Sequence, residues 1–269
     1  MRGVELSHSG EIFLNPELKD ILRCALVARV ALTAKGGVNL NDVPADLCEA
    51  LVRYRLRAMS VSIDGVDQVT YAKYRCGGDI GKVLDNIERI NFYKKKYASP
   101  YPVLQWQFIL FGHNEHQVCQ ARRMATEMRM NFAVMLNASD TYSPVKNKVK
   151  AYEDAGIKYI SRQDFMSGRD QAYVLPCYQL WDSPQINWDG QLLGCCKNVY
   201  KALGNVFEED LEQLLRRSAY VGMKRSVLGY SARNSGNTPC FKCSIFLKND
   251  RDIRLRTLVP SLIRADFAH

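Results

Sequence analysis

The chain has 269 residues, of which 47% are hydrophobic and 24% charged, a composition typical of globular proteins with a substantial core. Its most apolar stretch, Val103–Gly112, contains two glutamines and is shorter than the roughly 20 residues of a membrane span. No membrane association and no secretory signal are expected, and a cytoplasmic protein is predicted. The formal charge of +9 suits an anionic partner, but no nucleic-acid-binding motif is present, so a solvated basic surface is favoured and nucleic acid is not expected as a partner.

Residues 3–136 alternate between segments with strand-like and helix-like patterns. In the first helical segment apolar residues recur at i, i+3, i+4 and i+7, and Asn15 before Pro16 is typical of a capped helix start. Such alternation predicts a parallel sheet with helices packed outside it. The predicted strands are Val4–Ser7, Arg29–Thr33, Met59–Ile63, Val103–Phe111 and Phe132–Leu136. The predicted helical segments are Pro16–Val27, Pro44–Tyr54, Val69–Tyr97 and His113–Met128.

The pattern leaves open whether this sheet closes into a barrel. No G-x-G-x-x-G fingerprint and no Walker A loop follows a predicted strand, which argues against a nucleotide-binding doubly wound sheet. In a barrel-like sheet, functional residues are expected at the carboxyl ends of the strands. Those ends carry polar or glycine residues here, which an ordinary loop could also use.

The alternation ends near residue 160, where we place a domain boundary. The predicted parts are residues 1–160, residues 161–247 and a basic tail, residues 248–269. The second part is rich in turn-forming residues and in cysteine. Its one clear amphipathic helix is predicted at Leu211–Tyr220, after an acidic start that suits the helix dipole.

Nine cysteines are unusual in a chain without a secretory signal, and in a reducing compartment they are not expected to form disulfides. The Asp189-Gly190 pair between two apolar runs is a strong hairpin signal. A hairpin there would bring Cys177 close to Cys195. Cys240 and Cys243 form a C-x-x-C turn, which adds two further thiolates from one bend.

These four cysteines form a candidate metal site. Four soft thiolates suit either a tetrahedral zinc ion or a cuboidal iron–sulfur cluster, and four buried, unligated cysteines are the weaker alternative. Cys196 is expected to face away from Cys195, because adjacent residues of an extended chain point to opposite sides. His113 and His116 could share a helix face, but no carboxylate–histidine pattern accompanies them, so a surface role is favoured.

Two sets of motifs in this chain occur together in one known family. The C-terminal set is Cys177-x12-Gly190-x4-Cys195, Gly204-Asn205-Val206-Phe207 and Pro239-Cys240-x2-Cys243. The N-terminal set is Ser9-Gly10-Glu11, Val61-Ser62-Ile63-Asp64-Gly65 with the following Tyr74-Arg75, and Asn114-Glu115-His116. Together they resemble the radical SAM enzymes that carry a C-terminal SPASM-type domain. The resemblance covers about residues 3–247.

The resemblance implies an α/β fold, a partial radical SAM (β/α) barrel followed by a small cysteine-rich SPASM-like domain. The family's Cys-x3-Cys-x2-Cys loop, which binds the catalytic cluster after the first strand, does not occur in this sequence. The barrel is therefore expected to lack its first βα unit. The Cys240-x2-Cys243 pair is not followed by the further cysteines of longer versions, so one auxiliary cluster rather than two is implied.

The resemblance also implies cofactors and site residues. One auxiliary [4Fe–4S] cluster would be held by Cys177, Cys195, Cys240 and Cys243. S-adenosylmethionine would be bound if the missing N-terminal unit is present in the full-length protein. Its expected contacts are Gly10, Glu11, Thr33, Ser62 and Asp64, with the methionyl amino group at Gly10 and Glu11. No catalytic residue is assigned.

The implied function is that of an oxidoreductase or peptide-modifying enzyme that uses S-adenosylmethionine and is catalytically incomplete as this chain. No residue distinguishes a peptide from a sugar or another small molecule as the substrate, and a peptide is one candidate. Two alternatives stay open: a non-catalytic cluster- or peptide-binding remnant, and a zinc-stabilised interaction module.

Overall fold

A computed structural model describes residues 3–8, 10–169, 176–228, 238–243 and 245–246. The chain divides into two compact units, an N-terminal unit of residues 1–164 and a C-terminal unit of residues 165–269. The predicted basic tail, residues 248–269, lies outside the described residues. None of the helices within these ranges is long and apolar enough to cross a membrane.

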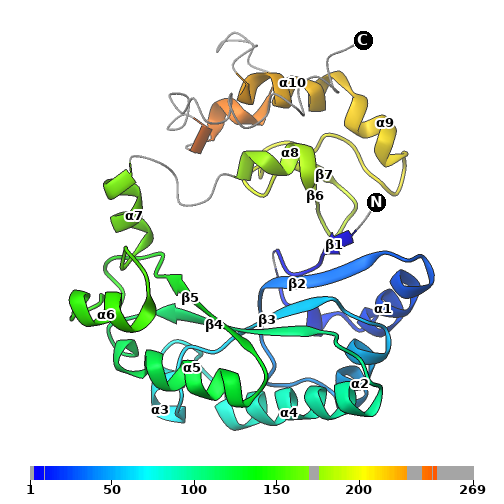
Figure 1. The fold of residues 1–269 in the computed structure, drawn as a ribbon. Helices are drawn as coiled ribbons and strands as arrows, with labels where there is room; N and C mark the ends of the chain where they lie inside the picture. The colour runs from blue at the N-terminus through cyan, green and yellow to red at the C-terminus, as the bar shows by residue number, and fades with distance from the viewer. Residues whose placement is uncertain (1–2, 9, 170–175, 229–237, 244, 247–269) are drawn as a thin grey trace. The chain divides into compact units, whose positions relative to one another are not determined.

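The N-terminal unit is built on a five-stranded parallel sheet (Figure 1). Its strands lie side by side in chain order, each paired in parallel with the next. Because strand–helix–strand connections are right-handed, this order places the connecting helices on one face, as in a barrel and unlike a doubly wound sheet. The strands are β1 (Gly3–Glu5), β2 (Ala31–Val38), β3 (Ala58–Ser62), β4 (Val103–Leu110) and β5 (Asn131–Leu136).

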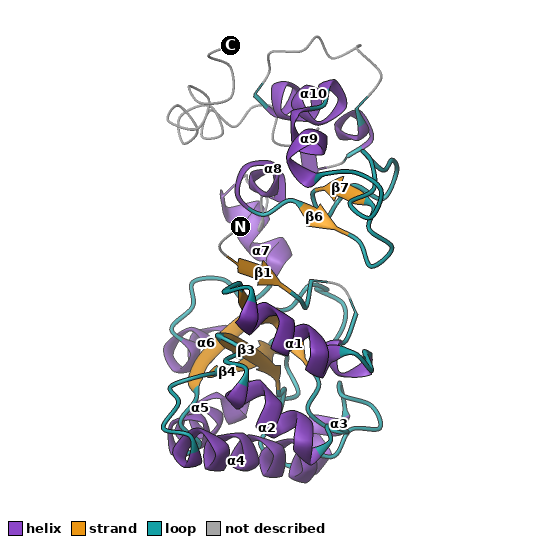
Figure 2. Ribbon diagram, turned by 90° about the vertical axis from the view of Figure 1, so that its right-hand side faces the viewer, coloured by secondary structure: helices purple, strands orange, loops and turns teal. Residues whose placement is uncertain are grey.

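Helices connect the strands, and α2, α4 and α5 lie together along one side of the sheet (Figures 1 and 2). The α-helices of this region are α1 (Leu18–Val27), α2 (Ala45–Arg53), α3 (Gln68–Ala72), α4 (Ile80–Lys96), α5 (Val118–Glu127), α6 (Lys148–Ala155) and α7 (Arg162–Arg169). Two short 3-10 helices, η1 (Ile12–Leu14) and η2 (Glu115–Gln117), precede α1 and α5.

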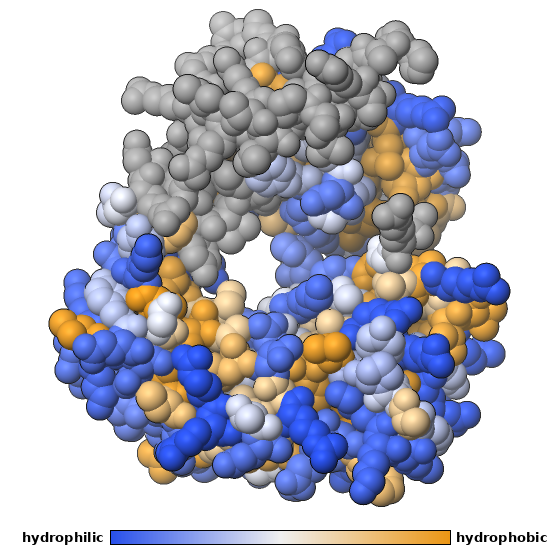
Figure 3. Space-filling view, in the orientation of Figure 1, coloured by the Kyte–Doolittle hydropathy of each residue, from blue (hydrophilic) through white to orange (hydrophobic). Residues whose placement is uncertain are grey.

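Strand β4 shows why the sheet has two unlike faces. Leu104, Trp106, Phe108 and Leu110 are buried and join one apolar core with the helices. The residues between them, including Gln105 and Gln107, are only half-buried on the opposite face. This period-two alternation is what a sheet covered by helices on one side requires. Hydrophilic and hydrophobic residues are mixed over the surface of the N-terminal unit seen in Figure 3.

In the N-terminal unit, two helix predictions are wrong in their boundaries. Helix α1 begins at Leu18, and Asn15 instead ends η1 and accepts a hydrogen bond from the Glu17 N–H at 2.8 Å. The carboxylate of Glu11 caps η1, so the chain first makes this short turn and the longer helix starts later.

The second wrong boundary concerns Val69–Tyr97, which is two helices rather than one. Gly77 adopts a left-handed backbone with φ +74° between α3 and α4. The Asp79 carboxylate then caps α4 by accepting from the N–H groups of Gly81 and Lys82 at 2.8 and 3.3 Å. A new cap two residues after a left-handed glycine ends one helix and starts another.

The C-terminal unit is a smaller assembly of short elements. Its apolar core includes Leu180, Leu192, Leu214, Tyr220 and Met223. The predicted helix Leu211–Tyr220 is two helices, because Arg217 has an extended ψ of 146° between them. The elements are η3 (Pro176–Tyr178), α8 (Gln179–Asp182), β6 (Gln185–Ile186), β7 (Leu192–Gly194), α9 (Leu211–Arg216), α10 (Ser218–Val227) and η4 (Pro239–Lys242).

The predicted hairpin is present, since β6 and β7 pair antiparallel around Asp189-Gly190. Gly190 has a φ of +81°, which favours glycine. The hairpin is also held from outside. The Asn205 side chain donates to the Asp189 carbonyl at 3.0 Å, and the Val206 N–H donates to the Gly190 carbonyl at 2.9 Å.

Substituting Gly190 tests this turn. In Gly190→Ala the new Cβ would lie 2.3 Å from Asn205 Oδ1 and 2.6 Å from Phe207 Cδ2, in addition to the strain of the positive φ. We expect the free energy of unfolding of the C-terminal unit to fall by about 2 kcal/mol, measured by denaturant-dependent proteolysis. Gly222→Ala in α10 is the control. Its Cβ would meet Thr238 at an ordinary 3.5 Å, so it should be neutral or stabilising. Equal free energies of unfolding for Gly190→Ala and Gly222→Ala would contradict the proposed strain at Gly190.

Candidate metal centre and the polar face of the sheet

The structure brings the four predicted ligand cysteines to one pocket. Cys177 lies in η3, Cys195 directly follows β7, and Cys240 and Cys243 lie in and just after η4. The hairpin brings Cys195 to the pocket that Cys177 lines, and the C-x-x-C turn adds Cys240 and Cys243 to the same pocket. The pocket is lined by Cys177, Cys195, Cys240, Cys243, Leu180, Lys197, Asn198, Met223, Val227, Pro239 and Phe246.

Burial dominates the electrostatics of these thiols. It raises the pKa of Cys177 to about 12, and the other three thiols add smaller contributions in the same direction. Burial followed by the thiols of Cys195 and Cys243 likewise raises the pKa of Cys240 to about 12. Four thiolates would repel one another in this mostly apolar pocket. A positively charged group bound between them would remove that cost.

The backbone near Cys195 offers hydrogen bonds to its sulfur. Burial raises the pKa of the Cys195 thiol, while the nearby backbone N–H groups of Lys197 and Asn198 lower it. Such donors favour the thiolate form that a metal requires. Cys196 is not part of the pocket lining, and its N–H donates to Gln179 Oε1 at 2.8 Å. That its side chain faces away from Cys195 stays a prediction.

The donor set fits an iron–sulfur cluster. In the described part of the chain, no three His, Cys, Asp or Glu side chains converge on a point where one metal ion could bind. The four thiols line one pocket and supply four soft ligands. A cuboidal cluster is held in this way, because each of its four cysteines bonds a different iron atom.

The other predicted site lies on the polar face of the sheet in the N-terminal unit. Parallel register places Ser60 beside Gln105 and Ser62 beside Gln107. Ser60 Oγ donates to Gln105 Oε1 at 2.9 Å. These side chains share the face opposite the helices and form a polar surface that leads to the carboxyl ends of the strands. Sequence reasoning did not assign the two glutamines, although their alternation with Trp106 and Phe108 was visible.

Gly10 and Glu11 follow β1 at the carboxyl edge of this sheet. The Glu11 carboxylate accepts from the N–H of Phe13 at 3.2 Å and from the N–H of Asn39 at 2.7 Å. It therefore joins the segment after β1 to the segment after β2. Gly10 has a φ of +87°, and no atom lies within 4 Å of a Cβ built there. Gly10 and Glu11 thus form a turn that has open space beside Gly10 and carries the Glu11 carboxylate.

Thr33 lies in β2 and is held by a carboxylate that the sequence did not mark. Its Oγ1 donates to Glu5 Oε2 at 2.6 Å. Glu5 Oε1 accepts from Ser7 Oγ at 2.6 Å and from the Lys35 N–H at 2.8 Å. Burial alone would raise the pKa of Glu5, but these hydrogen bonds outweigh it and the pKa is lowered. Thr33 is thus engaged in organising the ends of β1 and β2.

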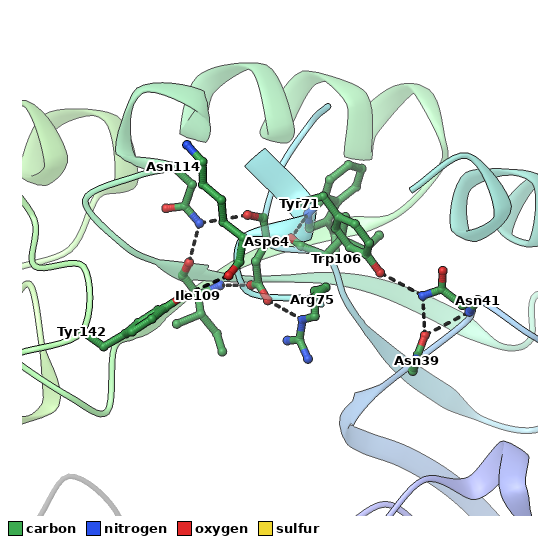
Figure 4. A network of polar contacts seen from close by, with 11 residues as sticks. Asn39, Asn41, Asp64, Tyr71, Arg75, Trp106, Ile109, Asn114 and Tyr142 are labelled. Atoms are coloured by element: carbon green, nitrogen blue, oxygen red, sulfur yellow. Dashed lines mark hydrogen bonds and ion pairs between the residues drawn. The ribbon is translucent and has the colours of Figure 1, made fainter. Parts of the chain in front are cut away.

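Asp64 is fully buried just after β3 and forms the centre of a polar network (Figure 4). Its Oδ2 accepts from Arg75 Nε at 2.6 Å, and its Oδ1 accepts from the Ile109 N–H at 2.6 Å. The Asn114 side chain donates to the Asp64 carbonyl at 3.0 Å. Burial raises the pKa of Asp64, and the Arg75 guanidinium opposes that rise. Ser62, two residues earlier, is also buried.

Arg75 is the functional candidate that sequence reasoning left without a role. Its Nε donates a hydrogen bond to the Asp64 carboxylate, and its guanidinium lies 5.1 Å from the centre of the Tyr74 ring. The side chain keeps 28% of its surface exposed, so it can also bind an anion at this edge. In the sequence, Arg75 was visible next to Tyr74 in one of the family motifs. Its hydrogen bond to Asp64 joins residues eleven positions apart, so this contact could be found only in the folded chain.

The two histidines that were considered as metal ligands differ in burial and in contacts. His113 is half-buried, with Nδ1 2.8 Å from Ser143 Oγ and its ring stacked on Phe111 at 5.1 Å. Burial lowers its pKa. His116 is exposed. His113 packs among aromatic rings with Tyr74 and Tyr142 nearby, which makes it part of the strand-end structure.

Comparison with known proteins bears on both units. Residues 177–244 match the SPASM family, an iron–sulfur cluster-binding domain. No curated protein matches the chain. Among solved structures, the chain is similar to SuiB of Streptococcus suis, determined bound to the precursor peptide SuiA, with a TM-score of 0.59 and 16% sequence identity. The match covers 91% of this chain but only 59% of SuiB.

These findings confirm two predictions. The C-terminal cysteines belong to a segment of the SPASM type, and that family binds iron–sulfur clusters. The α/β fold with a parallel sheet is shared with SuiB, and at this level of identity the similarity is one of fold. The residues predicted to contact S-adenosylmethionine stay a prediction.

Proposed function

We propose that this chain, which has the fold of the radical SAM type and carries a SPASM segment, binds an auxiliary [4Fe–4S] cluster and S-adenosylmethionine as part of a peptide-modifying oxidoreductase. The observation that carries the proposal is the convergence of four cysteines on one pocket within the segment that matches the SPASM family. The polar face of the parallel sheet supports a second binding site in the N-terminal unit.

In the C-terminal unit, four thiolates would hold the cluster. When bound, such a cluster supplies electron transfer. The chain contributes the four sulfur ligands, the N–H groups of Lys197 and Asn198 that donate to Cys195, and an apolar wall that excludes water. These features stabilise the charge of the ligands and set the polarity around them.

In the N-terminal unit, we assign Gly10, Glu11, Thr33, Ser62 and Asp64 to the S-adenosylmethionine site. Glu11 can accept the methionyl ammonium group, because one of its oxygens accepts from the Phe13 N–H and the other from the Asn39 N–H, and each keeps a lone pair to spare. Arg75, held by Asp64, would bind the carboxylate of the same amino acid. Gln105 and Gln107 on the polar face would then lie toward the substrate.

A peptide is the substrate we favour. SuiB, which shares the fold, was determined with a peptide bound, and a half-exposed row of amide side chains can pair with peptide groups. We place the protein in the cytoplasm, because the described cysteines are free thiols, as in reducing compartments.

Anaerobic purification tests the cluster. The protein should be brown and contain about four iron and four sulfide per chain. A colourless protein with about one zinc per chain would overturn the iron–sulfur assignment and favour a zinc-stabilised interaction module instead.

A second candidate function is cluster or peptide binding without catalysis. The observation in its favour is that these 269 residues contain no Cys-x3-Cys-x2-Cys motif. We therefore expect the chain by itself to bind S-adenosylmethionine weakly and to release no 5′-deoxyadenosine under reducing conditions.

Equilibrium dialysis measures the binding, and product analysis measures the cleavage. Glu11→Gln should weaken the binding while leaving the iron content unchanged. Cleavage by the chain alone would contradict the incomplete-site proposal. Unchanged binding in Glu11→Gln would contradict the assignment of Glu11.

A further inference from the structure

The opposite edge of the parallel sheet, where the strands begin, carries an unusual set of arginines. Arg29, Arg55 and Arg129 each have a φ of 57° and each stands between the end of a helix and the start of a strand. In each turn the next residue donates its N–H to a carbonyl five residues back: Val30 to Ala25, Leu56 to Leu51 and Met130 to Ala125, at 2.8–3.0 Å. The three arginines thus occupy the same position of the same helix-ending turn.

That position normally favours glycine. A non-glycine residue with left-handed backbone costs about 1 kcal/mol, and helices that end in this turn most often carry glycine there. The equivalent position after α4 holds Ala98, with φ 45°. Three arginines at three of four equivalent turns indicate that the positive charge at this edge has a use. Attraction to a helix C-terminus is a small effect and α4 already ends in Lys94, Lys95 and Lys96.

The arginines form a row along the sheet. They precede β2, β3 and β5, and neighbouring strands lie about 4.8 Å apart, so the row extends over about 15 Å. Lys94 comes close to its end, since burial and then the charge of Arg129 lower the pKa of Lys94. All three arginines are exposed, and none of them forms an ion pair within the residues that the structure describes.

A pocket opens in the middle of this row. It is lined by Val52, Arg53, Arg55, Tyr97, Ala98, Ser99, Pro100 and Tyr101. Arg57 lies over the Tyr101 ring at 4.4 Å, which adds a third cation beside the pocket. The nearby acid is already engaged: Glu49 accepts from the Tyr97 hydroxyl and pairs with Lys96 at 3.5 Å. The pocket therefore combines guanidinium groups, tyrosine rings and a hydroxyl.

We propose that this edge of the sheet binds phosphate groups of a nucleotide or of single-stranded nucleic acid, with one phosphate at Arg53 and Arg55 and a base against Tyr97 or Tyr101. Planar guanidinium groups match phosphate oxygens two at a time, and aromatic rings beside a basic groove are typical of single-strand binding. A row of cations suits a ligand whose charges repeat along a chain. This revises the expectation from sequence, which favoured a solvated basic surface and no nucleic-acid partner, because equivalent turns gather three arginines at one edge of the sheet.

Glycine substitution gives a test that spares the fold. The triple variant Arg29→Gly, Arg55→Gly, Arg129→Gly removes the charges and puts the favoured residue at each left-handed position. Its thermal stability should match or exceed that of the wild type. Binding of a fluorescent ten-nucleotide uridine RNA should weaken at least tenfold. The wild-type affinity should fall with salt with a logarithmic slope of about −2, as expected for about three phosphate contacts on a single strand.

The matched control is Arg123→Gln, Lys148→Gln, Lys158→Gln, which loses the same charge from exposed positions elsewhere in the N-terminal unit. It should bind RNA within about twofold of the wild type. If ATP at equal phosphate concentration competes strongly with the RNA, a free nucleotide is the preferred ligand. If ATP competes weakly, a nucleic acid strand is the preferred ligand. Equal binding by the triple glycine variant, or equal competition by a polyglutamate peptide, would overturn the proposal.

Discussion

Replacing Cys240 with serine should abolish the cluster of the C-terminal unit and expose that unit to proteases. Cys240 is buried, lies in η4 and lines the pocket with the other three cysteines. A serine hydroxyl is a hard, neutral ligand and does not replace a thiolate on iron. Metal binding couples to folding in small units with a modest core, so loss of the cluster should also loosen the chain around it.

The expected size of the effect is large. Iron and sulfide should fall from about four each per chain to near zero. Each loss of 1.4 kcal/mol raises the population of open forms about tenfold, and we expect at least that change in the rate of cleavage within residues 176–243. Iron analysis and limited proteolysis with mass spectrometry measure the two results.

Cys196→Ser is the matched control, because Cys196 adjoins a ligand but lies outside the pocket lining. It should keep its iron and its resistance to protease. Unchanged iron in Cys240→Ser would refute the ligand assignment. Equal iron loss in both variants would show that the region tolerates no substitution, and would remove Cys240→Ser as support for a specific ligand.

Local patterns in the sequence were enough to place the strands and the hairpin. All five predicted strands are present, although β2 spans Ala31–Val38 rather than the predicted Arg29–Thr33. The alternation of buried and polar residues in segments such as Val103–Leu110 depends only on near neighbours. The Asp189-Gly190 turn could also be predicted from near neighbours, because a tight hairpin turn of this kind requires a left-handed residue and glycine adopts that conformation. Two local turns explain why Cys177 can approach Cys195 and why Cys240 and Cys243 lie together, but the meeting of these two pairs in one pocket is a long-range feature of the folded unit.

Features that depend on distant partners were missed. Helix α1 starts later than expected because the Glu11 carboxylate first caps η1, and the Asn39 N–H, 28 residues away, also donates to that carboxylate. The polar face formed by Ser60, Ser62, Gln105 and Gln107 requires the register between β3 and β4, which the sequence does not state. The row of arginines at the start of the strands could be recognised only from the backbone angles of three turns.

Removing Arg75 should strongly destabilise the N-terminal unit. Asp64 is fully buried, and its charge is balanced by Arg75 at 2.6 Å. In Arg75→Met, the Ile109 N–H would be the one donor left to the carboxylate oxygens among the described residues. Breaking one partner of a buried pair costs about 3 kcal/mol, because the remaining charge stays in a poorly polar site. We therefore expect a fall of that size in the free energy of unfolding near neutral pH.

The same variant should show a characteristic pH dependence. Burial raises the pKa of Asp64 above its value in the unfolded chain, and loss of Arg75 would raise it further. A folded-state pKa above the unfolded one gives stability that is complete below the unfolded pKa and is lost as pH rises through the folded pKa. Arg75→Met should therefore lie closest to the wild type in acid, and the difference between them should grow as pH rises from about 4 toward 8.

Urea unfolding at several pH values, followed by hydrogen exchange of the β3 and β4 amides, measures this dependence. The double variant Asp64→Asn, Arg75→Met is the control, because it removes the buried charge together with its partner. It should recover part of the lost stability at pH 8 and lose the pH dependence that Asp64 contributes. If the single and double variants are equally stable at pH 8, the buried charge is not what Arg75 balances. A merely steric role for Arg75 would give a loss of stability that is the same at every pH.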